Sequence, residues 1–573
     1  MRGRTLSSAR HESPQQPQGR QGSRQGLPRR TPARAGLCDQ QEEPAHEGAP
    51  GVERAGLPLA LRSENRETID RVGRNHRRMD MDDDACYRAI ETRDRRFDGR
   101  LFVAVTTTKI YCRPFCPAPT PKRKNVRFFP TAAAAQEAGF HPCLRCRPET
   151  APELALWRGE SNTVTRALGL IESGVLDAAS VDALATRLGI GERQLRRLFR
   201  RYLGASPISI AQTRRILLAK QLIQDTQLPM TEVALAAGFG SIRRFNEIFQ
   251  RLYRRPPKAL RRTGIADASA GAVTVRLGYR PPYDWDAMIA FLRARAIPGV
   301  EAVSDQRYAR TIAIGCMHGV LVVEPAAENC LKATVRIANL RQLPAIVARV
   351  RRVFDLAADT VTIGGHLSQD PVLASLVAAR PGLRVPGAWD GFELAIRAVL
   401  GQQISVPAAT MLAGKLVSAF GMPMADTREE GLTHVFPTAR QLAEADLTVI
   451  GMPNARRMAL ASLAAAVVAD PLIFGPRRSL EEAIAQLRSL AGIGEWTAQY
   501  IAMRELREPD AFPASDIGLL RAMCDERGER PSAAALLAHA ERWRPWRAYA
   551  ALHLWASDPK PLSRAVTYDQ QAA

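Results

Sequence analysis

Two closely spaced pairs of cysteines constrain the fold of this 573-residue chain more tightly than any other feature. Cys112 and Cys116 form a C-x3-C pair, Cys143 and Cys146 form a C-x2-C pair, and 26 residues separate the pairs. Each pair can supply two thiolates to one side of a tetrahedral ion, and four thiolates favour zinc or an iron–sulfur centre. We therefore expect this segment to fold around one metal site. A closed zinc site with only a structural role is the simplest interpretation of the spacing.

The charge of the chain favours a polyanionic partner. Its formal net charge is +22 and its isoelectric point is about 10.2, which makes nucleic acid the expected partner. An anionic membrane surface is the alternative, but no apolar run is long enough to span a bilayer, so no membrane partner is predicted. The odd count of nine cysteines in a large chain predicts a reducing, cytoplasmic location rather than a secreted disulfide framework. Association with the nucleoid is expected of a protein whose partner is DNA. Residues 1–80, rich in Arg, Gln, Gly and Pro, are predicted to form a disordered basic tail.

The segment around the cysteines resembles the N-terminal domain of Ada-type alkylation-response proteins. The motifs TTTKIYCRPFCPAP and NVRFFPTAAAAQEAGFHPCLRCRPE carry the resemblance, and residues 102–105 read as a short strand in a predicted domain at residues 82–150. The resemblance implies one zinc ion on all four cysteines. It also implies that Cys112 is the thiolate that accepts a methyl group from a DNA methylphosphotriester, in a single turnover. Thr108 and Arg145 match positions that contact DNA in this family.

A repeated helix-turn-helix pattern follows at residues 160–263. Gly189 and Gly238 lie 49 residues apart, each between a short apolar helix and a longer basic helix. Glycine in the turn and small alanines in the first helix allow the close helix crossing of this motif. A long predicted helix at residues 208–225 joins the two units. The arrangement resembles the AraC/XylS DNA-binding domain, in which two recognition helices enter successive major grooves of promoter DNA.

Each recognition helix is predicted to present one polar face to DNA. Contact with phosphates alone, without sequence readout, is the alternative role for any single arginine on these faces. The residues expected to face DNA are Arg193, Gln194, Arg196 and Arg197 in the first unit, and Ser241, Arg243, Arg244 and Asn246 in the second.

Residues 264–272 are small and polar and are predicted to be a linker to an α+β domain at residues 273–385. Strands are expected at residues 273–277, 308–314 and 319–323, with a helix at residues 285–296. The motifs PPYDW and FLRARA resemble the N-terminal domain of AlkA-type 3-methyladenine-DNA glycosylase II, which is TATA-binding-protein-like. The resemblance implies that Phe291 reaches the base pocket, although a core role is equally consistent with the sequence.

Residues 487–520 contain a helix, a glycine turn, a second helix and a carboxylate at a further helix start. Gly492 and Gly494 leave backbone N–H groups bare at the N-terminus of the second helix, where they suit a DNA phosphate. Asp516 is that carboxylate. With PGAWDGFELAIRAVLGQQISV and ERWRPWRAYAALHLW, the pattern resembles the AlkA-type helix-hairpin-helix glycosylases across residues 386–560, before a tail at 561–573.

This resemblance implies roles for individual residues. Asp516 is the catalytic carboxylate that stabilises an oxocarbenium-like sugar, and simple helix capping is its alternative role. Trp496, Tyr500 and Trp555 form an aromatic pocket for a cationic base, and Gln403 takes the position of the DNA wedge. Trp496 also occupies the place of the Schiff-base lysine of glycosylase-lyases. We therefore expect a monofunctional glycosylase that needs no cofactor.

The sequence thus predicts a multidomain chain, mainly α with α+β parts. Its expected domains are a small zinc-bound α+β domain, a double helix-turn-helix, a TATA-binding-protein-like domain and a helical glycosylase domain. The expected function is excision of 3-methyladenine and 7-methylguanine, fused to a methylphosphotriester-accepting transcriptional regulator. The expected partners are double-stranded DNA, alkylated or carrying a promoter, and RNA polymerase. The alternative is a methylation-switched activator with an inactive glycosylase remnant.

Overall fold

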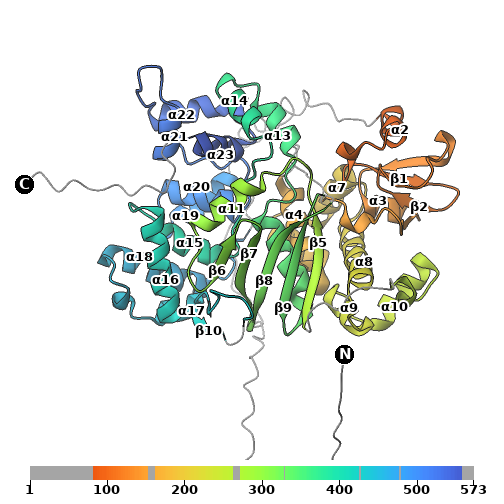
Figure 1. Cartoon of the computed structure of the whole chain (residues 1–573), viewed down its shortest axis with the longest axis horizontal. Coiled ribbons are helices and arrows are strands. Elements are labelled where there is room, and N and C mark those ends of the chain that lie inside the picture. Colours follow the sequence, from red (N-terminus) through yellow and green to blue (C-terminus); the bar gives the residue numbers. More distant parts are fainter. Residues whose placement is uncertain are drawn as a thin grey trace, which may run out of the picture. The chain divides into compact units, whose positions relative to one another are not determined.

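The computed structural model describes residues 82–152, 162–261, 271–327, 329–424, 427–475 and 479–557 (Figure 1). All of them belong to the second of two units, Pro58–Ala573, the first being Met1–Leu57. The predicted basic tail, most of the predicted linker and the C-terminal tail lie outside the described residues. Over the ranges described, every helix is too short or too polar to cross a bilayer.

The cysteine-containing domain is a small sheet with helices around it, as predicted. Its strands follow the order β3-β1-β2-β4, with β1 antiparallel to β2 and β3, and β2 parallel to β4. Tyr111, Phe102 and Phe140 are buried between the sheet and the helix that follows it. The elements are α2 (Asp83–Glu91), β1 (Phe102–Val105), β2 (Ile110–Cys112), β3 (Val126–Phe129), α3 (Ala132–Glu137) and β4 (His141–Pro142).

The double helix-turn-helix is confirmed, and each turn glycine lies between a short helix and a longer one, as predicted. Gly189 and Gly238 both have positive φ, the conformation that glycine adopts without steric cost. A Cβ on Gly238 would lie 2.3 Å from Oδ2 of Asp177. The helices are α4 (Asn162–Glu172), α5 (Val175–Ala178), α6 (Val181–Arg187), α7 (Glu192–Leu203), α8 (Pro207–Asp225), α9 (Met230–Ala236) and α10 (Ile242–Tyr253).

A five-stranded antiparallel sheet of order β5-β9-β8-β7-β6 forms the next part of the chain. Three of its strands were predicted, whereas β6 and β9 were not assigned. In β9 the alternate residues Leu331, Ala333, Val335 and Ile337 point into the core. The elements are β5 (Ala272–Gly278), α11 (Trp285–Ala294), β6 (Glu301–Ser304), β7 (Arg307–Ile314), β8 (Met317–Ala326), β9 (Cys330–Ile337) and α12 (Leu343–Val353).

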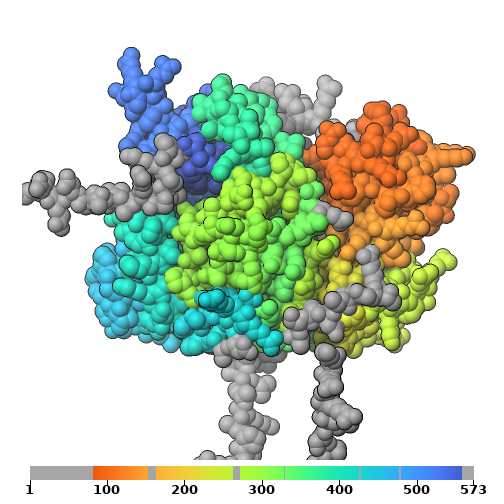
Figure 2. Space-filling view, in the orientation of Figure 1, coloured from red at the N-terminus to blue at the C-terminus, as the bar shows by residue number. Residues whose placement is uncertain are grey.

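The rest of the described chain is a helical body with one short hairpin. That hairpin, β10 (Met422–Pro423) with β11 (His434–Val435), lies against the sheet, and Figure 2 shows this cyan part of the chain beside the green strands. Thr311 donates a hydrogen bond to the His434 carbonyl there. The helices are α13 (Thr360–Leu367), α14 (Pro371–Ala379), α15 (Gly391–Leu400), α16 (Val406–Phe420), α17 (Ala439–Glu444), α18 (Asn454–Ala469), α19 (Leu480–Arg488), α20 (Glu495–Arg504), α21 (Ile517–Ala522), α22 (Ala533–Ala540) and α23 (Arg547–Ser557).

The hydrophobic cores divide differently from the predicted boundary at residue 385. Leu367 of α13 and Leu373 of α14 are buried in the core of the helical body, whereas Val350 of α12 belongs to the core of the sheet. Helices α13 and α14 therefore pack on the helical body although they precede residue 385 in the chain. The predicted linker also ends one residue too late, because Ala272 already pairs with Arg336 in the sheet.

Candidate active sites

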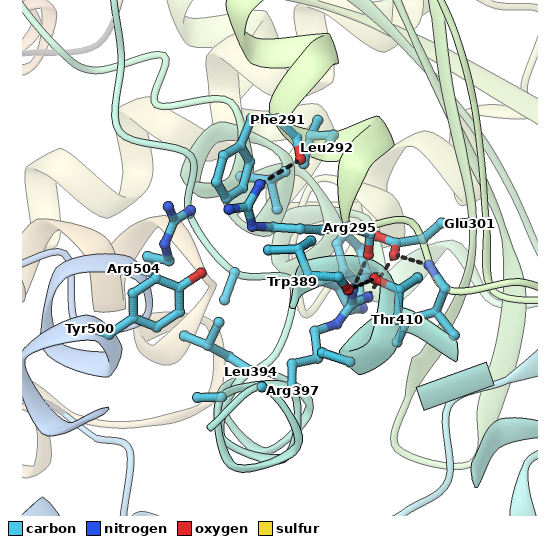
Figure 3. Close-up of a pocket in the computed structure, with 18 of the residues that line it drawn as sticks. Phe291, Leu292, Arg295, Glu301, Trp389, Leu394, Arg397, Thr410, Tyr500 and Arg504 are labelled. Atoms are coloured by element: carbon cyan, nitrogen blue, oxygen red, sulfur yellow. Dashed lines mark hydrogen bonds and ion pairs between the residues drawn. The ribbon is translucent and has the colours of Figure 1, made fainter. Parts of the chain in front are cut away.

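A cavity of about 530 Å³ lies in the helical body, against the end of α11. Its lining includes Phe291, Trp496, Tyr500, Asp516 and Trp555, so it brings together residues that the sequence predicted for one site. Figure 3 shows one side of this cavity, where Phe291 from α11 lies near Tyr500 from α20. The size suits a planar group such as a nucleobase.

Asp516 is held at the cavity wall by four hydrogen bonds. As the N-cap of α21, its Oδ1 accepts the backbone N–H of Gly518 at 2.9 Å and of Leu519 at 3.2 Å. The indole of Trp496 donates to Oδ2 and the indole of Trp555 donates to Oδ1, each at 2.8 Å. Asp516 can therefore cap helix α21 and act in the cavity at the same time. The carboxylate is fixed in orientation before any ligand binds.

The two aromatic residues predicted to share a face of α20 do so. The rings of Trp496 and Tyr500 are stacked, with centroids 5.2 Å apart and an angle of 12° between their planes. Each ring is partly buried, and both line the cavity with Trp555. Because the pair is already stacked, an entering base meets the outer face of the stack or its edge.

Phe291 lines the cavity, but two guanidinium groups already lie against its ring. The Arg295 guanidinium carbon lies 3.9 Å from the ring centroid and that of Arg504 lies 4.1 Å from it. Arg504 also lies 4.6 Å from the centroid of Tyr500. Burial lowers the pKa of Arg504 to about 10 and lowers that of Arg295 as well. The sequence interpretation missed both arginines, although Arg295 stands within the FLRARA motif.

The glycine turn between α19 and α20 has the conformation that a phosphate-binding hairpin needs. Gly492 has a φ of 80°, and a Cβ there would lie 2.5 Å from the Cβ of Ala459. Gly494 is the N-cap of α20 and has open space around its Cα. Both glycines are exposed, while Ile493 between them is buried. The N–H groups at the start of α20 are thus accessible to an anion.

Gln403 lies in the turn between α15 and α16, with an exposed side chain and a φ of 61°. Its neighbours secure this turn. Gln402 donates hydrogen bonds to the Gly492 carbonyl at 2.8 Å and to Thr497 Oγ1 at 3.2 Å. Arg456 donates to the Gln402 carbonyl at 2.6 Å. Gln403 was predicted from the sequence to act as the wedge, whereas Gln402 and Arg456, which fasten its turn, were not assigned a role.

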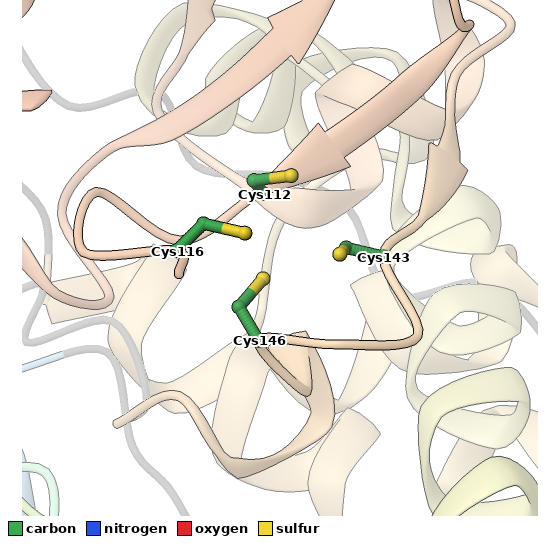
Figure 4. A group of neighbouring side chains, drawn as sticks. All are labelled: Cys112, Cys116, Cys143 and Cys146. Carbon is green, nitrogen blue, oxygen red and sulfur yellow. The ribbon is translucent and has the colours of Figure 1, made fainter. Parts of the chain in front are cut away.

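The four cysteines come together as predicted, and Figure 4 shows their sulfurs pointing toward one common centre. All four sulfurs lie within 4.8 Å of one another. Tetrahedral zinc thiolates at about 2.3 Å from the ion have sulfurs separated by roughly 3.8 Å, so the cluster fits zinc. Cys112, at the end of β2, and Cys116 are partly exposed, whereas Cys143 and Cys146 are buried.

The electrostatics of the cluster also call for a cation. Hydrogen bonding with the Cys112 thiol lowers the pKa of Cys116 and the pKa of Cys143. The same contacts, first with Cys116, raise the pKa of Cys112. Four sulfurs this close cannot all ionise independently, because each negative charge opposes the next. A divalent cation is the group that lets all four act as thiolates.

A buried lysine joins the cysteine cluster to the second domain. Lys220 of α8 is fully buried, and its Nζ donates to the Cys143 carbonyl and to Glu149 Oε2, each at 2.7 Å. Arg147 adds an ion pair of 2.7 Å with Asp225 at the end of the same helix. Sequence analysis missed Lys220, because a lysine in a long helix is normally a solvated residue.

The residues predicted to face DNA are exposed. On α7 and α10 they alternate with buried Leu195 and Phe245, as the amphipathic pattern requires. Arg196 and Arg243 each form an ion pair with a glutamate four residues away, and Ser241 caps α10 by accepting the Arg244 N–H. The exposed set is Thr108, Arg145, Arg193, Gln194, Arg196, Arg197, Ser241, Arg243, Arg244 and Asn246.

Three family models match the chain in the order expected from the sequence. They are the metal binding domain of Ada at residues 85–149, a helix-turn-helix domain at residues 184–263, and the AlkA N-terminal domain at residues 274–390. These matches confirm the predicted fusion of a metal-binding, a helix-turn-helix and an AlkA-type segment.

Two curated relatives cover different shares of the chain. The probable bifunctional transcriptional activator/DNA repair enzyme AlkA of Mycobacterium tuberculosis is 43% identical over 491 residues, which is 85% of this chain and 98% of the relative. DNA-3-methyladenine glycosylase 2 of Escherichia coli is 38% identical over 287 residues, which is 49% of this chain and 96% of the relative. Among solved structures, the 3-methyladenine DNA-glycosylase from Archaeoglobus fulgidus matches at 23% identity and a TM-score of 0.44, over 50% of this chain and 98% of that one.

Proposed function

We propose that the helical body of this chain is a monofunctional DNA glycosylase. The chain belongs to the AlkA family of bifunctional transcriptional activators and DNA-repair enzymes. Its proposed substrates are alkylated purines in double-stranded DNA, such as 3-methyladenine and 7-methylguanine. The observation that carries the proposal is the Asp516 carboxylate, held in a base-sized cavity by the indoles of Trp496 and Trp555. The remaining cavity wall is largely apolar and aromatic, as a pocket for an extruded base requires.

The proposed reaction is hydrolysis of the N-glycosidic bond. The bond from the sugar C1′ to the base nitrogen breaks, and the base leaves with the electron pair, which neutralises its positive charge. Asp516 stabilises the oxocarbenium-like sugar electrostatically, because its charge is oriented before the sugar charge develops. Water then adds to C1′ and loses a proton, leaving an abasic site. Trp496 in place of a Schiff-base lysine supports hydrolysis without strand cleavage.

Two exposed turns are proposed to hold the DNA. The N–H groups at Gly494 and the start of α20 suit a backbone phosphate, which anchors the duplex beside the cavity. Gln403 is proposed to fill the gap that the extruded nucleotide leaves, and its amide can hydrogen-bond the unpaired base opposite. The hydrogen bonds from Gln402 hold the Gln403 turn against the glycine hairpin. The phosphate-binding turn and Gln403 therefore stay at a fixed distance from each other.

The cysteine domain is proposed to hold one zinc ion through Cys112, Cys116, Cys143 and Cys146, with none in the glycosylase. When bound, zinc keeps the sulfurs ionised at neutral pH. Cys112 is the proposed methyl acceptor. Its sulfur attacks the methyl carbon, the carbon–oxygen bond breaks, and the phosphate returns to an anionic diester. The cluster thereby loses one negative charge, which strengthens its attraction to DNA phosphates.

The helix-turn-helix domain is proposed to direct the methylated protein to promoter DNA, where contact with RNA polymerase activates transcription at the nucleoid. The proposed domains are residues 82–150, 160–263, 273–385 and 386–560. Fragmentation in a mass spectrometer of the tryptic peptide that contains both Cys112 and Cys116 tests the sensor. After exposure to methylated DNA, one added methyl group is expected on Cys112, and a methyl group on Cys116 instead would disprove the assignment.

Release of free 7-methylguanine from methylated DNA tests the glycosylase and separates it from an inactive remnant. Wild-type protein is expected to release the base, and Asp516→Asn to release it at least about a hundredfold more slowly. Asp446→Asn is the matched control, because Asp446 also caps a helix with its carboxylate but does not line the cavity. Release by the wild type no faster than by Asp516→Asn would leave only the activator function.

A further inference from the structure

Two arginines on the wall of the cavity, the buried Arg504 and the partly buried Arg295, have no carboxylate partner among the described residues. Arg504, the last residue of α20, is 3% exposed, and Arg295 directly follows α11. Arg504 Nη1 donates to the Pro386 carbonyl at 2.8 Å, and its Nε has no hydrogen-bond partner in the described chain. Figure 3 shows both guanidinium groups beside the rings of Phe291 and Tyr500.

The other arginines of the same cavity are paired. Arg310 forms an ion pair of 2.7 Å with Glu393, and Arg397 forms one of 2.6 Å with Glu301. Burying a cation without an anion is costly, and the rings beside Arg504 offset only part of that cost. Arg504 lines the cavity with a guanidinium whose hydrogen bonds are incomplete, so a ligand that reaches this guanidinium meets a group that can still donate. A guanidinium offers donors only, so the matching ligand group is a hydrogen-bond acceptor.

We propose that Arg504, together with Arg295, is a specificity-determining residue that favours an extruded base carrying a carbonyl oxygen over one carrying an amino group at the same edge. The inference rests on the proposed glycosylase function and deepens it by naming the preferred base. The 6-oxo group of 7-methylguanine accepts hydrogen bonds from the guanidinium. The 6-amino group of 3-methyladenine is a donor and leaves the buried Arg504 donors unpaired.

The two lesions form a suitable pair for a test, because both bases are cationic. Their repulsion from the two guanidinium groups is therefore similar and largely cancels when the two release rates are compared as a ratio. What remains is the difference between an oxygen acceptor and an amino donor, which a polar site discriminates far better than an apolar one.

The experiment measures single-turnover release of 7-methylguanine and of 3-methyladenine from the same methylated DNA by the full chain. In Arg504→Met, the ratio of 7-methylguanine to 3-methyladenine release is expected to fall about tenfold. Arg504→Lys, which keeps a donor, is expected to recover part of the ratio, and Arg295→Met to lower it less than Arg504→Met. Arg384→Met is the matched control, because Arg384 is equally buried but does not line the cavity.

The outcomes separate the inference from the proposed function. A lowered ratio in Arg504→Met with an unchanged ratio in Arg384→Met supports the specificity role. If Arg504→Met slows both bases in equal proportion, or leaves both unchanged, the specificity role is overturned while the glycosylase function stands. If the wild type releases neither base, the proposed function itself has failed. Thermal unfolding of each variant shows whether a lower release rate comes from misfolding. If Arg504→Met does not fold, the ratio measured with Arg504→Lys decides the test.

Discussion

The indole Nε1 of Trp555, in the last described helix, donates a 2.8 Å hydrogen bond to Oδ1 of Asp516 at the start of α21. Trp555 therefore positions the carboxylate in addition to lining the base cavity. Trp496 does the same from α20 through the other carboxylate oxygen. A carboxylate fixed by two indoles cannot rotate away when the sugar becomes positively charged, so its charge is already in place.

Loss of one indole donor is expected to slow base excision. Trp555→Phe keeps an aromatic ring but removes the N–H, and the rate of 7-methylguanine release should fall about tenfold, the usual cost of one hydrogen bond to a charged group. Trp543→Phe is the matched control, because the Trp543 indole donates to Asp370 outside the cavity. It should lower the unfolding temperature without changing the release rate. Equal rates in wild type and Trp555→Phe would contradict the positioning role.

Gln403→Gly should separate stability from activity. Gln403 has a positive φ, which costs a non-glycine residue about 1 kcal/mol, while glycine gains roughly 0.5–1 kcal/mol of chain entropy on unfolding. These terms nearly cancel, so the free energy of unfolding should change by less than about 1 kcal/mol. The loss of the side chain should weaken binding to DNA with an abasic site but not to undamaged DNA. Equal binding of both DNAs by wild type and variant would rule out the wedge role.

The stability of the protein should carry a pH dependence from Glu505. Burial raises the pKa of Glu505 from 4.5 to about 7, although Arg352 lies 2.5 Å from its Oε1, and its Oε2 has no hydrogen-bond partner in the described chain. The folded state therefore binds a proton more tightly than the unfolded state does. The free energy of unfolding should fall as pH rises from about 4.5 to about 7 and then level off.

Urea unfolding of Glu505→Gln across that pH range tests this expectation. The neutral amide removes the titration, so the decline between pH 4.5 and 7 should be smaller than in the wild type. Glu526→Gln makes the same chemical change at an exposed position and should keep the wild-type slope. A Glu505→Gln profile parallel to that of the wild type would show that Glu505 does not titrate in this range.

Breaking the Lys220–Glu149 pair should destabilise the protein strongly. Lys220→Met removes one of the two cations that contact the buried Glu149 carboxylate and leaves only Arg147, at 3.0 Å, so the cost should be at most about 3–5 kcal/mol. Lys220→Met combined with Glu149→Gln should recover part of this loss, because no isolated charge remains. Chemical unfolding of the four proteins of this double-mutant cycle measures the coupling. Arg243→Met, at an exposed side chain, is the control and should change stability by less than about 0.5 kcal/mol.

Much of the fold was predictable from local patterns. The helix-turn-helix repeat carries its own periodicity and turn glycines, and the two cysteine pairs carry the spacing of a metal site. Gly492 and Gly494 were predicted in the same way, because a glycine turn between two helices is a pattern of neighbouring residues. Strand β9 was not predicted, although Leu331, Ala333, Val335 and Ile337 alternate regularly with polar residues, and its place between β5 and β8 depends on pairing with both strands.

The sequence by itself determined the order of the domains, the cysteine cluster, the glycine hairpin and the candidate carboxylate Asp516. Only the tertiary structure decided which distant residues act on them. It brought Lys220 to the Cys143 carbonyl, both indoles to Asp516, and Arg504 to Phe291. The physical reason is that helix and turn patterns arise from interactions over a few residues. A buried cation or an indole donor takes its role from partners that only packing brings within hydrogen-bonding distance.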